Sequence, residues 1–472
     1  MNFQSAHFLI FLALVSGVCW ACRDRQTIRK NVLLAASYYF YACWDWRLAS
    51  LLMLVTAVTF LAGIRIEAST QTGQRKRWLA FELLVCLGTL GGFKYTGFFA
   101  ASALELMHAM GLQGSMPTLN LLLPLGISFF TFQALSYVID VYRKQQSACT
   151  DWRDIALFVA FFPTVQAGPI TRAHQLLPQF ADNHVYIEAN LQEGMILVVR
   201  GFVKKLLFAD VLALHLVDPV FAAPANFSSL FLLLALYGYT FQIYMDVSAY
   251  TDVARGSAML CGYRLPINFD RPYTAATLSN FWQRWHISVS SFFRDYLFIS
   301  LGGSRHGNVY LNLMATFVAI GIWHGAGWNF VLYGFIHGAV ICMERWSRLR
   351  RQARGDVSEG EVGLPPLAGI VLTFHLVVFS RLLFRASDLT SAGNYLQAMA
   401  KSEVSGIPLS LQAGLALGSA AILHWLCPRC SQFASLAFQR LNFLAQGIVL
   451  AMLGYLFIAV SVDTAPFLYF KF

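Results

Sequence analysis

The sequence predicts an all-α, polytopic integral membrane protein. Of its 472 residues, 57% are hydrophobic and only 12% are charged, which is about half the charged fraction of an average soluble domain. One membrane-spanning helix needs about 20 mostly apolar residues, and the chain offers roughly ten such windows separated by short polar connections. This composition argues against a soluble multidomain enzyme.

The basic residues predict which connections face the cytoplasm. The chain carries 34 Lys and Arg against 24 Asp and Glu, a formal net charge of +10. Most of these cations stand in short clusters between apolar windows, as expected of cytoplasmic loops. Such clusters also attract anionic lipids or a phosphate-bearing substrate. The absence of a basic module interleaved with aromatic residues argues against a nucleic-acid partner.

The N-terminal windows follow this charge rule in order. The window at 7–22 lacks the basic flank and the cleavage site of a signal peptide, so we expect a retained first span. Basic clusters at 23–30 and 65–77 enclose a hairpin of two spans at 31–64, and both would face the cytoplasm. The next window leads into a linker at 100–118 without Lys or Arg, which we expect on the opposite side.

The middle of the chain is less regular. The window at 155–170 is short and contains helix breakers such as Pro163, which free backbone groups that bare lipid cannot satisfy. We therefore expect a re-entrant or protein-buried segment. Long windows follow at 195–217 and 228–254, the second with polar residues Tyr244, Asp246, Ser248, Tyr250 and Asp252. Such groups normally face a cavity or a partner, and both structural hydrogen bonding and a proton relay are open for the two aspartates.

The last third of the chain begins with a basic run at 345–354 and a charged, Gly-rich connection to about residue 364, which we expect in the cytoplasm. Apolar windows at 368–383, 413–426 and 443–462 complete the chain. Counting crossings places both termini on the side opposite the cytoplasm.

Nine cysteines include two Cys-x-x-Cys pairs, Cys19/Cys22 and Cys427/Cys430. Four thiolates can hold a structural zinc ion. Both pairs lie at the ends of apolar windows, however, where cysteine behaves as a small hydrophobic residue. We expect no metal site.

The stretch at 274–305 is too polar for a lipid-facing span and too apolar for a loop. On a continuous helix at about 100° per residue, a sector of about 80° would carry Asn280, Arg284, Ser288, Ser291 and Asp295. His286 lies elsewhere on this wheel, so we expect it to face the protein interior. The wet face is either an interfacial amphipathic surface or part of a functional lining.

His324 interrupts an apolar segment at 309–340 and is followed by small residues that allow a backbone or a thin substrate to approach. A neutral imidazole can accept the proton of a hydroxyl that attacks an acyl carbonyl. The residues alone leave a catalytic base and a hydrogen-bonded core histidine open. On a continuous helix His337 would lie roughly 20 Å further along and on about the opposite face, so we do not expect it at the same centre.

Nine short motifs are spread along the chain from residue 124 onward. They are Pro124-Leu-Gly-Ile-Ser-Phe-Phe-Thr-Phe132, Phe162-Pro163, Gly168-Pro-Ile170, Arg284-Trp-His-Ile-Ser288, Arg294-Asp-Tyr296, Leu301-Gly-Gly303, Gly321-Ile-Trp-His-Gly325, Phe384-Arg-Ala386 and Phe467-Leu-Tyr-Phe470. Together they resemble the membrane-bound O-acyltransferase family, specifically the bacterial branch that acetylates exported polysaccharides. The first hundred residues contribute only their hydrophobic pattern.

The resemblance implies a fold of about 11 spans, each of the usual length, with re-entrant segments and a central tunnel. It implies a catalytic histidine at the narrowest point of the tunnel, which His324 matches. On this basis we expect N-terminal transmembrane helices at 1–118, a catalytic core at 119–345, a cytoplasmic linker at 346–364 and C-terminal transmembrane helices at 365–472.

The resemblance also implies a role in a bacterial inner membrane, where the counted crossings would place both termini in the periplasm. The protein would pass acetyl groups from cytoplasmic acetyl-CoA, a substrate and not a bound cofactor, to a periplasmic SGNH-type acetyltransferase within a polysaccharide secretion machinery. The polymer would be alginate, cellulose or a similar glycan.

The same resemblance assigns the remaining candidate residues. The second polar position of the family falls on Asn280 or His286, with Trp323 beside the base in the tunnel. Side chains that could meet the acyl donor are Arg284, Ser288, Arg294, Tyr244 and Asp246. Two alternatives remain: a D-alanyl transfer subunit fed by a carrier-protein thioester, or a non-enzymatic pore or exporter in which Asp246, Asp252 and His324 line a polar pathway.

Overall fold

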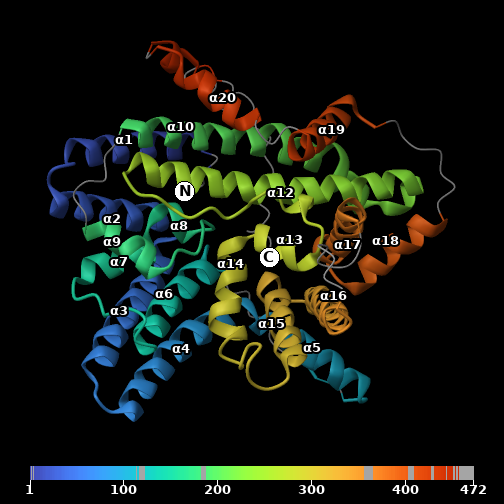
Figure 1. Ribbon diagram of the computed structural model, residues 1–472, viewed down its shortest axis with the longest axis horizontal. Helices are drawn as coiled ribbons and strands as arrows, with labels where there is room; N and C mark the ends of the chain where they lie inside the picture. The colour runs from blue at the N-terminus through green and yellow to red at the C-terminus, as the bar shows by residue number, and fades with distance from the viewer. Residues whose placement is uncertain are drawn as a thin grey trace. The chain divides into compact units, whose positions relative to one another are not determined.

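In the computed structural model, the regular secondary structure of the described residues consists of helices (Figure 1). These residues run from 1 to 455, without residues 2, 4, 113, 116–122, 182–187, 356–364, 402–408, 427–429, 443, 450–451 and 453–454. No strand occurs within these ranges, so the all-α prediction is confirmed. The motif at 467–470, Cys427 and most of the predicted window at 443–462 lie outside the described residues.

Three helices among the described residues are long and apolar enough to cross a membrane: α3 (Trp46–Ala68), α12 (Ser229–Leu260) and α17 (Pro366–Arg385). A fourth crossing results if α4 (Thr72–Lys94) and α5 (Thr96–Ala109), which meet at a bend of 61°, form one span. Several apolar helices in one chain agree with the predicted multi-pass membrane protein.

Two predicted connections are helical instead. α5 occupies the first half of the linker expected at 100–118, because this stretch is rich in Ala, Leu, Glu and Met, which favour a helix. α16 (Trp328–Ala353) continues through the basic run that begins at residue 345. Arginine is a good helix former, and the guanidinium of Arg350 lies 3.9 Å over the ring of Trp346, one turn earlier.

The chain divides into two compact units, residues 1–194 with 254–266, and residues 195–253 with 267–472. This division follows contacts and does not coincide with the sequence-based boundaries at 118, 345 and 364. α12 passes from the second unit into the first without interruption.

In the first unit, the short segment that we expected to be re-entrant or protein-buried is covered on all sides. Every residue from 154 to 173 is buried, and Asp154 forms an ion pair of 2.6 Å with Lys30. Gly126 has a φ of 72°, and a Cβ there would overlap the carbonyl oxygen of Val165. The helices of this unit are α1 (Ala6–Ala21), α2 (Gln26–Ala42), α3, α4, α5, α6 (Ile127–Tyr142), α7 (Trp152–Ala160), α8 (Phe162–Val165), α9 (Ala173–Ala181) and the start of α10 (Glu188–Val203).

The second unit continues α10 and contains all the predicted site residues. Its other elements are the π-helical turns η1 (Lys204–Asp210) and η2 (Ala213–Val217), α11 (Asp218–Ala222), most of α12, α13 (Leu278–Arg284), α14 (Ile287–Phe292), the π-turn η5 (Phe293–Phe298), α15 (Val309–His324), α16, α17, α18 (Leu389–Lys401), α19 (Leu411–Trp425), α20 (Cys430–Gln439) and the 3₁₀ turns η3 (Pro224–Asn226) and η4 (Pro272–Thr274).

The polar face of α12 packs against α10 and η1, which run antiparallel beside it (Figure 1). Lys205 Nζ lies 2.8 Å from an oxygen of Asp210 and 2.8 Å from an oxygen of Asp246. A π-helical turn brings residues five apart onto one face, which is why Lys205 and Asp210 meet. Asp252 accepts hydrogen bonds from Arg200 and Lys204. Both aspartates of α12 are thus ion-paired.

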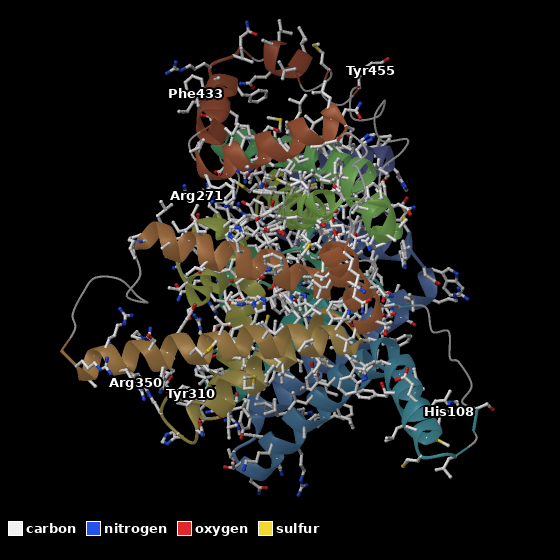
Figure 2. All side chains as sticks on the ribbon, turned by 90° about the vertical axis from the view of Figure 1, so that its right-hand side faces the viewer. His108, Arg271, Tyr310, Arg350, Phe433 and Tyr455 are labelled. Atoms are coloured by element: carbon white, nitrogen blue, oxygen red, sulfur yellow. The ribbon has the colours of Figure 1, made fainter. Side chains whose placement is uncertain are left out.

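The apolar segment around His324 is a helical hairpin rather than one continuous helix. α15 ends at His324, three residues form the turn, and α16 returns alongside it. Figure 2 shows Tyr310 and Arg350 near the open end of this hairpin. Gly321 and Gly334 allow the two helices to approach closely, because neither residue has a side chain at the contact. A Cβ at Gly321 would overlap the carbonyl oxygen of Phe330, and a Cβ at Gly334 would overlap that of Phe317.

Candidate active site

A break in the amphipathic segment decides where its polar side chains point. α13 and α14 are separated at Trp285 and His286, and the φ of His286 is 45°, in the left-handed region. The prediction of one continuous wet face is therefore wrong, because the helix phase changes at the break. Arg284 before the break is partly exposed, whereas Ser288 after it is buried.

His324 is buried among aromatic rings at the turn between α15 and α16. Its ring centroid lies 4.8 Å from that of Trp323, 4.9 Å from Phe384 and 6.2 Å from Tyr333. Only 3% of the residue is exposed. The end of a helix leaves backbone groups without an intrahelical partner, and a bound reactant can satisfy such groups.

His337 contradicts the continuous-helix prediction. The hairpin brings Tyr333 of α16 to His324, with 6.2 Å between the ring centroids. His337 lies one turn after Tyr333 on the same helix, and these two rings are 4.2 Å apart, so His337 is much nearer to His324 than a continuous helix would place it. The indole N–H of Trp282 donates to Nδ1 of His337 at 3.2 Å. Ser380 Oγ lies 3.0 Å from Nε2 and donates its own proton to a backbone carbonyl.

These contacts fix the protonation of His337. Because an indole nitrogen only donates, Nδ1 carries no proton, and Nε2–H donates to Ser380. The ring is neutral, with both nitrogens occupied by protein. His337 is therefore a hydrogen-bonded core histidine, the role that the sequence left open for His324.

The two candidates for the second polar position lie in different surroundings. His286 is buried, as expected, and its ring lies 5.8 Å from that of Trp323. Trp323 thus contacts both His286 and His324. Asn280 is partly exposed on α13, where its Oδ1 accepts a hydrogen bond of 2.8 Å from Nε of Arg284.

The proposed donor-binding residues do not form one cluster. Arg284 Nη1 lies 3.7 Å from a carboxylate oxygen of Asp270. The backbone N–H of buried Ser288 donates to Asn268. Tyr244 is buried near these two residues, because its ring contacts Trp285, which follows Arg284. Arg294 is exposed and pairs with Asp295, and Asp246 is paired with Lys205.

Residues 33–384 match the membrane-bound O-acyltransferase family. The chain belongs to that family. It is accordingly an O-acyltransferase, and the resemblance drawn from the short motifs is confirmed.

The names of three similar proteins refer to three different polymers. The chain is 39% identical over 403 residues to a protein named "Probable alginate O-acetylase AlgI" from Pseudomonas aeruginosa, covering 84% of this chain and 75% of the relative. It is 33% identical over 399 residues to a peptidoglycan O-acetyltransferase of Helicobacter pylori, covering 78% and 73%. A teichoic acid D-alanyltransferase of Streptococcus thermophilus is 29% identical over 295 residues, covering 57% of this chain and 70% of the relative.

One charged residue near His324 escaped the sequence reasoning. Arg381 of α17 is fully buried, and its guanidinium contacts the rings of Tyr333 and Phe384, the same two rings that contact His324. The signal was present in the sequence. Arg381 is an ionisable residue inside the apolar window at 368–383, the criterion that selected His324.

Proposed function

We propose that this O-acyltransferase transfers acetyl groups from cytoplasmic acetyl-CoA across a bacterial inner membrane for the O-acetylation of an exported polysaccharide. The strongest support is the 39% identity to a probable alginate O-acetylase over most of the chain. A periplasmic SGNH-type acetyltransferase would receive the acetyl group. The fold would comprise about 11 spans of ordinary length around a tunnel, with both termini in the periplasm.

His324 is the general base in this proposal. It accepts the proton of the attacking hydroxyl while the new C–O bond forms at the thioester carbon. The C–S bond then breaks, and the coenzyme A sulfur takes that proton from the imidazolium. Burial among Trp323, Tyr333 and Phe384 supports this role, because an enclosed imidazole can exchange its proton with the reactants rather than with bulk water.

The other candidate residues take supporting roles. His286 is the better candidate for the second polar position, because it packs against the indole that also contacts His324. Arg284, which is partly exposed, is the best candidate for the phosphates of the donor. Ser288, Arg294 and Tyr244 remain donor-binding candidates. The ion pair with Lys205 favours a structural role for Asp246.

The test is transfer of labelled acetyl from acetyl-CoA by the purified full-length protein in detergent. His324→Ala should lower the rate of acetyl transfer or hydrolysis by about 10²- to 10⁴-fold, the usual contribution of general acid–base catalysis. The matched control is His375→Ala on α17, which removes a partly buried histidine that contacts Tyr237 and should keep the wild-type rate. A rate in His324→Ala within threefold of wild type would refute the assignment.

The likeness to a teichoic acid D-alanyltransferase keeps one alternative donor in the design. The same preparation is given a D-alanyl carrier-protein thioester. Turnover of this thioester, without turnover of acetyl-CoA, would replace acetyl by D-alanyl in the proposal. Ion or glycan flux without turnover of either thioester would favour a pore.

A further inference from the structure

Arg381 is a buried cation without a carboxylate partner among the described residues. Its residue exposure is 0%, and its guanidinium carbon lies 4.4 Å over the ring of Trp285. Nη1 donates to the hydroxyl of Tyr333 at 3.3 Å. Nε and Nη2 have no hydrogen-bond acceptor within the described part of the chain.

This arrangement is energetically unusual. A buried charge is costly unless it is paired, and the cost persists even after the surroundings relax. Contacts with aromatic rings recover only part of this cost. Arg385, one turn later on α17, shows the ordinary solution, because it is partly exposed and lies 2.9 Å from a carboxylate oxygen of Asp218.

The unused donors lie close to the general base. The ring of Phe384 is 4.9 Å from the His324 ring and 5.4 Å from the Arg381 guanidinium carbon, so these two groups are no more than about 10 Å apart. The ring of Tyr333 also contacts both. Since the Tyr333 hydroxyl accepts from Arg381, its own proton points to another acceptor.

The N–H groups of Arg381 near His324 that lack an acceptor among the described residues are explained if their acceptor is present only during the reaction. When a hydroxyl attacks the thioester carbon, the carbonyl oxygen becomes an oxyanion, and its charge returns to the carbonyl when the C–S bond breaks. Preorganised donors aimed at such an oxygen are among the largest contributions to acyl transfer.

We propose that Arg381, together with the hydroxyl of Tyr333, stabilises the oxyanion of the acyl-transfer intermediate at the site of His324. This inference rests on the proposed acetyl transfer, for which it supplies the group that receives the negative charge. His324 handles the proton and Arg381 the oxyanion, so the two residues act on different atoms of the same intermediate.

The experiment compares Arg381→Met with the matched control Arg385→Met in full-length protein. We expect Arg381→Met to lower kcat for acetyl-CoA by about 10²- to 10³-fold, the usual effect of losing one oxyanion donor. KM and the Kd of a non-reactive thioether analogue of acetyl-CoA should change less than threefold, because the ground state carries no oxyanion. Arg385→Met should keep kcat within threefold.

Thermal unfolding in detergent separates this role from a structural one. Arg381→Met removes a buried charge and keeps much of the side-chain volume, so we expect an unchanged or higher Tm alongside the lost kcat. A fall in Tm that accompanies the loss of activity would assign Arg381 to the core. If the methionine variant does not fold, Arg381→Gln and Arg381→Lys decide, since each should show a reduced kcat with an unchanged KM.

Two failures are distinguishable. A wild-type kcat in Arg381→Met or Arg381→Gln, with His324→Ala inactive, would overturn the oxyanion role alone. An absence of acetyl turnover in the wild type, or full activity in His324→Ala, would overturn the proposed function itself.

Discussion

Replacing Lys205 by Met tests the buried ion network between η1 and α12. Lys205 is the shared cation of Asp210 and Asp246, at 2.8 Å from each, and all three side chains are at most 7% exposed. Removing one partner of a buried ion pair costs about 3–5 kcal/mol of unfolding free energy. We expect the upper end of this range, because one substitution leaves two buried carboxylates without their common cation.

The structure also ranks the neighbouring substitutions. Asp246→Asn leaves Lys205 paired with Asp210 and should cost only about 1.5–3 kcal/mol, the value of a hydrogen bond to a charged group. Lys204→Met is the matched control. Asp252 keeps both hydrogen bonds from Arg200, so the expected cost is at most about 1 kcal/mol.

The assay is unfolding of purified protein in mixed micelles under increasing SDS, followed by tryptophan fluorescence. A Lys205→Met variant that loses no more stability than Asp246→Asn would refute the charge argument. Donor kinetics of Asp246→Asn add an independent readout. A KM for acetyl-CoA that rises several-fold at unchanged stability would assign Asp246 to donor binding instead of the ion network.

Three further predictions concern the hairpin and its surroundings. Gly334→Leu should separate α15 from α16 and lower both stability and kcat, because the leucine side chain would overlap the carbonyl oxygen of Phe317. Thermal unfolding and turnover equal to those of the wild type would contradict the close packing. Arg284→Ala should raise the KM for the donor more than it lowers kcat. Asp270→Asn removes the carboxylate beside the Arg284 guanidinium and should lower that KM. If steady-state assays give both variants the same KM, Arg284 does not belong to the donor site. His337→Phe should cost about 1–3 kcal/mol of unfolding free energy through the unsatisfied indole N–H of Trp282, with a kcat loss below tenfold; a loss as large as that of His324→Ala would make it part of the reaction machinery.

Several features followed from the sequence because they depend on composition or on local pattern. Apolar windows predicted helices, and the prolines and glycine around residue 163 predicted a segment that must be enclosed, which the burial of 154–173 bears out. The predicted burial of His286 is also confirmed, although the helix breaks at this residue and the periodicity behind the prediction does not continue through it. Each of these inferences needs only the side chain and its immediate neighbours in the chain.

Features that depend on helix breaks did not follow. The left-handed backbone of His286 and the turn after His324 changed the direction of every residue beyond them. A helical wheel with a constant angle per residue therefore placed the buried Ser288 on the exposed face. A constant rise per residue placed His337 too far from His324. Breaks of this kind are decided by packing, such as the close approach of α15 and α16, which no single helix encodes.

The sequence by itself determined that this chain is a helical membrane protein with an acyltransferase motif around His324, because hydrophobic windows and short motifs are properties of contiguous residues. Only the tertiary structure decided which polar groups meet. It paired Lys205 with Asp210 and Asp246 through a π-helical turn, and it brought Arg381 to the rings that contact His324. The physical reason is that the cost of burying a charge depends on its neighbours in space, and these come from segments far apart in the chain.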